Sequence, residues 1–124
     1  MFLEVATADG QGTARIKIDT IIRFRPSHGS AEPPGGTVID YADQRFQTSD
    51  GTSAIVERIG DDLHLVQLTT PVAKPVFLNA TKVTAIREAT QNDHELANAV
   101  VRVAQHDQAV TESPAEVEQL LASG

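Results

Sequence analysis

Two stretches of the sequence decide the fold: TVIDYADQRFQTSDGTSAIVERI, residues 37 to 59, and AVVRVAQHDQAVTESPAEVEQLL, residues 99 to 121. When Thr37 is set against Ala99, similar residue types fall into register along both stretches, as in the pairs Val38 with Val100 and Ile55 with Val117. We call this the repeat alignment. Self-similarity at a fixed spacing indicates a structural unit that occurs more than once. We therefore predict two degenerate copies, residues 1–62 and 63–124, that together form one compact domain.

The composition favours strands within each copy. Val, Ile and Thr together make 32 of the 124 residues, and these β-branched side chains pack well on a pleated surface. In Arg15-Ile16-Lys17-Ile18 the polar and apolar residues alternate, which predicts a strand with its isoleucines facing inward. We expect an α+β, mostly β fold in which each copy has about five short antiparallel strands and a closing helix. A copy of this size buries little by itself, so we expect the two to pack as a barrel-like pseudo-dimer.

The closing helix of the second copy has the clearest local signal. In Ser113-Pro114-Ala115-Glu116, Ser stands at the N-cap, Pro at the first helical position and Glu at the third, which is a capping box. The equivalent helix of the first copy is predicted near residues 52 to 59, where Gly60 ends it. Residues 93 to 105 are ambiguous, because Asn92 and Asp93 are typical of a helix start whereas the repeat predicts a strand.

Charge and cysteine content exclude several classes of protein. The net charge of −7 argues against a general nucleic-acid binder, because phosphate recognition needs clustered Lys and Arg. Without cysteine the chain can form no disulfide and no thiolate zinc site. The N-terminus lacks the pattern of a signal peptide, and no apolar run is long enough to span a membrane. We expect a cytoplasmic protein that does not contact membranes.

Two segments of the second copy carry a family resemblance. PVFLNATKVTAIRE, residues 75 to 88, and TESPAEVEQLL, residues 111 to 121, resemble the small bacterial flagellar and swarming-motility protein family. The resemblance implies a small bacterial protein. The strand order with a terminal helix is also similar to LytTR-type domains, and this second resemblance implies DNA binding through basic residues.

Two surfaces are candidates for binding. Four cations lie close together in sequence on the outward faces of two strands: Arg15, Lys17, Arg23 and Arg25. They predict either contact with an anion, a nucleic acid or an acidic partner, or a solvated face balanced by nearby carboxylates. In the repeat alignment the second copy has Phe77, Ala85 and Arg87 at the positions of three of them, which predicts a less polar partner face.

The sequence supplies no catalytic or metal-binding pattern. The four histidines show no helical metal-ligand spacing, and no nucleophile, base and electrophile can be assembled from the sequence. We therefore assign no catalytic residue, metal ligand or cofactor, and expect a protein-interaction or regulatory module. The expected partner is another protein; a second copy of the chain stays open, as does nucleic acid bound by the four cations.

Overall fold

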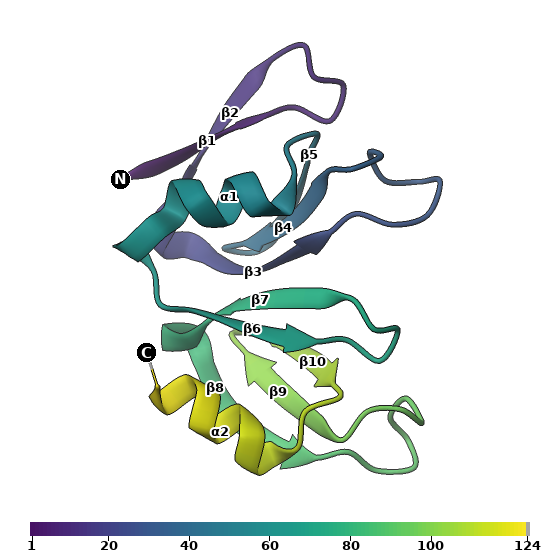
Figure 1. Cartoon of the computed structure of the whole chain (residues 1–124). Helices are drawn as coiled ribbons and strands as arrows, with labels where there is room; N and C mark the ends of the chain where they lie inside the picture. The colour runs from purple at the N-terminus through teal and green to yellow at the C-terminus, as the bar shows by residue number, and fades with distance from the viewer. Residues whose placement is uncertain (124) are drawn as a thin grey trace. The chain divides into compact units, whose positions relative to one another are not determined.

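In the computed structural model, which describes residues 1–123, the chain divides into two compact units. The first unit is Met1–Leu63, and the second begins at His64. Most of the regular structure in both units is antiparallel strand, and a helix closes each one (Figure 1). The expected mostly β class is therefore confirmed.

The first unit contains a hairpin, a three-stranded meander and a helix. Strand β1 pairs with β2 in the hairpin, β4 lies between β3 and β5 in the meander, and α1 packs against β1 and β3. The bounds are β1 Phe2–Ala6, β2 Thr13–Lys17, β3 Ile21–Pro26, β4 Thr37–Tyr41, β5 Gln44–Thr48 and α1 Thr52–Ile59, with short 3-10 turns at Ile18–Thr20 and Gly60–Asp62.

The second unit has the same order of elements. Strand β6 pairs with β7, β9 lies between β8 and β10, and α2 packs against β6 and β8. The bounds are β6 Leu65–Thr69, β7 Pro75–Asn79, β8 Val83–Glu88, β9 Ala99–Val103, β10 His106–Val110 and α2 Pro114–Ala122, with a 3-10 turn at Ala80–Lys82. Residues 99–103 thus form a strand, which decides the ambiguity between helix and strand.

Each strand and helix of the second unit begins where the repeat alignment places it, except β6, which begins one position later than β1 predicts. The agreement extends to irregular features. A register shift interrupts the pairing of β3 with β4 and recurs between β8 and β9. Ala42 and Ala104, in the turns after β4 and β9, both have a positive φ, at 49° and 51°.

The buried side chains of each unit come from its hairpin, its meander and its helix. Alternation places Ile16 in the core and leaves Arg15 and Lys17 exposed, as the sequence predicts. In the first unit the fully buried residues include Leu3, Val5, Phe24, Ile39, Ile55 and Ile59. In the second unit they include Leu68, Val76, Leu78, Val101, Val110 and Val117.

The two helices end and begin as their sequences predict. Gly60 takes a φ of 53° at the end of α1, a conformation that suits glycine and stops the helix. At the start of α2 the Ser113 Oγ accepts from the Glu116 N–H, and the Glu116 carboxylate accepts from the Ser113 N–H. The predicted capping box is therefore confirmed.

Of the predicted barrel-like pseudo-dimer, a closed barrel is not formed within either unit, and the pseudo-dimer stays a prediction. Within the first unit the hairpin β1–β2 and the meander β3–β5 exchange no strand pairing, and in residues 64–123 the hairpin β6–β7 and the meander β8–β10 likewise remain separate. The 3-10 turn between β2 and β3, like that between β7 and β8, redirects the chain out of the hairpin. Neither unit therefore closes on itself.

Candidate functional site

The four predicted cations lie on two different sheets. Arg15 and Lys17 are on β2, which pairs with β1, whereas Arg23 and Arg25 are on β3, which pairs with β4. Arg15 and Lys17 are exposed, and the register places Arg15 opposite Glu4. The structure therefore divides the cations into one pair on β2 and one on β3.

Arg23 belongs to a network around a buried carboxylate. The Asp40 side chain, which is 7% exposed, accepts from the Arg23 Nε at 2.7 Å and from the Arg45 Nε at 2.7 Å. Burial alone would raise the pKa of Asp40, but hydrogen bonds from Arg45 and Arg23 outweigh it and lower that pKa below its ordinary value. Arg23 therefore helps to keep a buried aspartate ionised.

Arg25 holds the long loop between β3 and β4. Its guanidinium makes two hydrogen bonds to the Glu32 carboxylate, at 3.0 and 2.8 Å, and Glu32 also accepts from the His28 N–H at 2.7 Å. The Arg25 hydrogen bonds lower the pKa of Glu32 to about 2, against the effect of desolvation. A ligand anion would have to compete with this bidentate ion pair.

The predicted partner face of the second unit is also divided between sheets. Phe77 is half-buried on β7, whereas Ala85 and Arg87 are exposed on β8. Arg87 makes two hydrogen bonds to the Asp93 carboxylate, at 2.9 and 3.1 Å, and these lower the pKa of Asp93. The two predicted residues on β8 are therefore a small apolar side chain and an arginine held in an ion pair.

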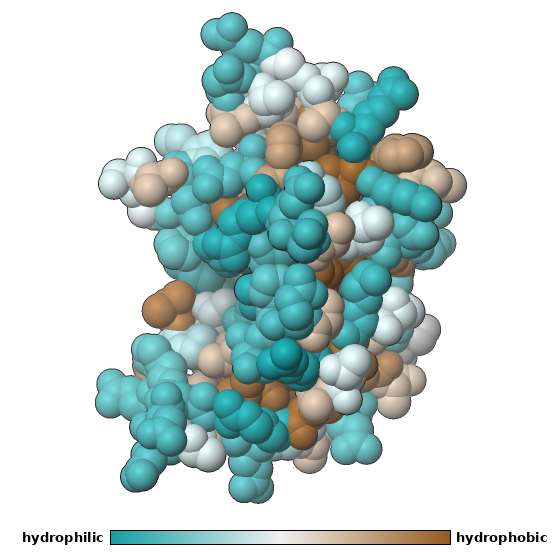
Figure 2. All heavy atoms as spheres, turned by 180° about the vertical axis from the view of Figure 1, so that it is seen from behind, coloured by the Kyte–Doolittle hydropathy of each residue, from teal (hydrophilic) through white to brown (hydrophobic). Residues whose placement is uncertain are grey.

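The exposed large apolar side chains are few and lie elsewhere. Viewed from behind, the surface is mostly polar and its apolar side chains are scattered (Figure 2). The exposed ones are Met1, Phe2, Val72, Leu96 and Leu120. Phe2, on β1, and Leu120, near β6, stand out because each lines a groove at the first strand of its own unit. Neither groove was predicted from the sequence.

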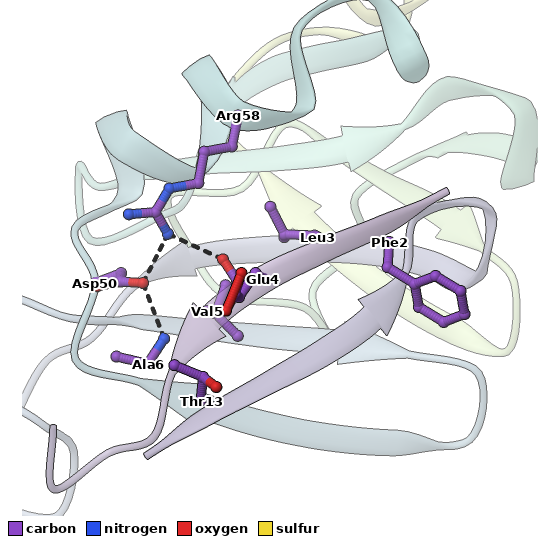
Figure 3. Close-up of a pocket in the computed structure, with 8 residues that line it drawn as sticks. All are labelled: Phe2, Leu3, Glu4, Val5, Ala6, Thr13, Asp50 and Arg58. Atoms are coloured by element: carbon purple, nitrogen blue, oxygen red, sulfur yellow. Dashed lines mark hydrogen bonds and ion pairs between the residues drawn. The ribbon is translucent and has the colours of Figure 1, made fainter. Parts of the chain in front are cut away.

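In the first unit, the side chains of Asp50 and Arg58 cover the outer edge of β1 at its groove. The Ala6 N–H donates to the Asp50 carboxylate at 3.0 Å, and Arg58 donates to the same carboxylate at 2.7 Å and to the Glu4 C=O at 3.1 Å (Figure 3). Arg58 and, to a smaller extent, the Ala6 N–H lower the pKa of Asp50. The pair thus offers β1 one acceptor and one donor, as a neighbouring strand would.

In the second unit, the hydrogen bonds at the two ends of β6 show which residues face its partner strand. The His64 C=O accepts from the Ala80 N–H at 2.9 Å, and the Thr70 N–H donates to the Lys74 C=O at 2.7 Å. Because alternate residues of an antiparallel strand bond to opposite sides, Val66 and Leu68 also face β7. The residues whose backbone groups point to the outer edge are Leu65, Gln67 and Thr69.

The outward backbone groups of Thr69 already have hydrogen-bond partners within the second unit. The Thr69 N–H donates to the Glu112 carboxylate at 2.9 Å, and the Thr69 C=O accepts from the Thr111 N–H at 2.8 Å. Strand β6 is a terminal strand of its sheet, so among residues 64–123 no strand lies beside the outward backbone groups of Leu65 and Gln67. Two N–H and two C=O groups are therefore open at this edge.

The open edge lines a groove between β6 and the end of α2. The groove is lined by His64, Leu65, Val66, Gln67, Leu120 and Ser123. Leu120 is 41% exposed. An unpaired strand edge beside an exposed apolar side chain can accept an extended polypeptide segment.

The repeat alignment explains why only one edge is covered. Asp50 and Glu112 are equivalent in it, and each accepts from the N–H of the last residue of a first strand. Arg58 corresponds in the same way to Leu120, which has no group that could bond a strand. The correspondence was visible in the sequence, but the position of residue 120 beside β6 became visible only in the fold.

Two further findings concern other classes of site. Within residues 1–123, no three His, Asp or Glu side chains gather in a way that could hold a metal ion. In the same part of the chain, every helix is too short or too polar to cross a bilayer.

The chain was also compared with known proteins. It has no match among protein-family models, curated proteins or solved structures. The resemblance of residues 75 to 88 and 111 to 121 to the flagellar and swarming-motility family therefore stays a prediction.

Proposed function

We propose that this chain is a non-enzymatic module that binds another polypeptide, which adds as an extra strand to the outer edge of β6. One observation carries the proposal: the open backbone groups of Leu65 and Gln67 line a groove together with exposed Leu120. Addition of a strand satisfies the backbone groups, and an apolar pocket beside the edge supplies selectivity.

The contrast between the two units supports this proposal. An open edge is an aggregation hazard, and charged side chains are a common way to protect it. Arg58 and Asp50 protect β1 in this way, and Glu4 adds a charge on the strand. The corresponding stretch of β6, Leu65 to Leu68, has no charged residue, which favours binding over protection.

We further propose that the two units are degenerate copies of one ancestral unit. The recurrence of the strands and helices in the repeat alignment supports this, as do the shared register shift and the shared positive φ at Ala42 and Ala104. On this proposal the units differ at the edge of the first strand, where one copy has the covering Arg58 and the other has Leu120.

Photo-crosslinking tests the binding function. A benzophenone amino acid at position 120 is expected to crosslink to a polypeptide in living cells that express the protein. The same residue at position 72, an exposed valine between β6 and β7, is the matched control and is expected to give little crosslinking. Equal crosslinking from both positions, or none from position 120, would overturn the proposal.

A gel-shift titration tests the alternative function, nucleic-acid binding by the four cations. We expect no salt-sensitive shift of DNA or RNA, because Arg23 and Arg25 already bind Asp40 and Glu32. A shift that is lost when Arg15 and Lys17 are replaced by alanine would favour nucleic acid instead. These two residues are exposed on β2, so their replacement leaves the core unchanged.

A further inference from the structure

The groups at the outer edge of β6 indicate which polypeptide binds there. We infer that the polypeptide bound there is the β6 strand of a second copy of this chain, joined in a two-fold symmetric antiparallel pair. This inference rests on the proposed function. It identifies the partner by the donors, acceptors and charges that the edge presents.

The open backbone groups are complementary to themselves. If two β6 strands run antiparallel with Val66 opposite Val66, then Leu65 of each copy lies opposite Gln67 of the other. Residues whose backbone groups face each other in an antiparallel pair exchange two hydrogen bonds. The four open groups of one copy therefore match the four of the other, and none is left over.

The same register sets no like charges opposite each other. It places His64 of one copy opposite Leu68 of the other, next to the outer end of β6 where Glu112 binds the Thr69 N–H. At its centre the segment is neutral, so like charges do not oppose each other.

The edge of β1 lacks this complementarity. The same register there would place Phe2 opposite Glu4, and the Glu4 C=O already accepts from Arg58. The Arg58 guanidinium, which also binds Asp50, stands in the path of an incoming strand, whereas the second unit has Leu120 at that position. Pairing of the β6 edge with its own copy closes the assembly at two chains, because a two-fold interface uses the same edge of both.

Sedimentation velocity across a dilution series tests this inference. The wild-type chain is expected to change from monomer to dimer as its concentration rises. Leu120→Arg reproduces the covering arginine of the first unit and is expected to weaken the dimer at least about tenfold. Val72→Arg makes the same kind of change at an exposed site outside the groove and is expected to dimerise like the wild type.

A second variant guards against a folding defect in Leu120→Arg. Gln67→Pro removes one outward N–H without breaking the ladder to β7, and it too is expected to weaken the dimer. Circular dichroism of both variants should match that of the wild type. A dimer unaffected by either folded variant would overturn the inference.

Hydrogen exchange resolves the same question by residue. The amides of Leu65 and Gln67 are expected to become protected as the concentration rises, whereas the amide of Glu4 is not. A wild-type chain that stays monomeric throughout would refute the dimer. If position 120 still crosslinks to a different protein, the proposed function stands and only the second copy is excluded; if it crosslinks to nothing, both fail.

Discussion

Asp40 illustrates how single residues hold the first unit together. It lies on β4 between Arg23 on β3 and Arg45 on β5, and the register places it directly opposite both. In the second unit Arg102 and Asp107 occupy the positions of Asp40 and Arg45, so the charges are exchanged, and the position of Arg23 holds an alanine. One unit therefore has a triad around a buried aspartate where the other has an exposed pair.

Asp40→Asn is expected to lower the free energy of unfolding by about 2 kcal/mol, because two guanidiniums lose the charge that compensates them and Arg23 is largely buried. Urea denaturation measures the change. Asp107→Asn is the matched control, since its ion pair with Arg102 is about half exposed and contributes less than about 0.5 kcal/mol. Equal losses in the two variants would contradict the role given to burial.

At the scale of elements, the two helices differ in how they begin. Ser113 starts α2 with a full capping box, whereas Gly51 starts α1 without any side-chain cap. Position 51 therefore leaves the first N–H groups of α1 to other partners. Because the two helices occupy the same place in their units, they show the same element with and without a side-chain cap.

Ser113→Ala is expected to destabilise the chain by about 1 kcal/mol, because the Glu116 N–H loses its acceptor. Thermal unfolding followed by circular dichroism measures this. Ser113→Thr keeps the hydroxyl and is expected to restore most of the stability. If alanine and threonine behave alike, the cap does not contribute.

Residues 99–103 show how a tertiary contact decides an element. The segment before them has the residues of a helix start, and the repeat alone predicted a strand. In the structure, residues 99–103 pair with β10 on one side and β8 on the other, and Val101 and Val103 are fully buried. Pairing on two edges outweighs the local preference, because it satisfies the backbone and buries β-branched side chains together.

Across the whole molecule, carboxylates are held ionised by neighbouring donors. The pKa values of Glu32, Asp40, Asp50 and Asp93 are all lowered, and an arginine contributes to each. These ion pairs lie in both units, so both respond to acid. A carboxylate with a lowered pKa in the folded chain binds protons more readily after unfolding.

The stability of the chain is therefore expected to fall in acid. The free energy of unfolding should be constant from neutral pH down to about 5 and decrease below about 4. In that range the carboxylates bind protons in the unfolded chain but stay ionised in the folded chain. Glu32, with a pKa of about 2, keeps contributing until the pH approaches that value. Urea midpoints measured from pH 7 to pH 3 check this, and a midpoint that rises towards acid pH would contradict it.

The sequence by itself determined the local features of this protein. Alternation in Arg15 to Ile18, the Ser113 capping box, Gly60 and the repeat alignment each depend on neighbours in the chain or on comparison of the chain with itself. These predicted a mostly β chain with a helix at the end of each half. They could not predict which strands pair, because pairing depends on contacts between residues far apart in sequence.

The tertiary structure alone decided the candidate site. The four cations were grouped by sequence distance, yet the 3-10 turn after β2 sends Arg23 and Arg25 to another sheet, where carboxylates bind them. Conversely, Leu120 has no notable feature as a residue in a helix. It gained a role only because α2 packs against β6, which places an apolar side chain beside backbone groups that the ladder to β7 leaves open.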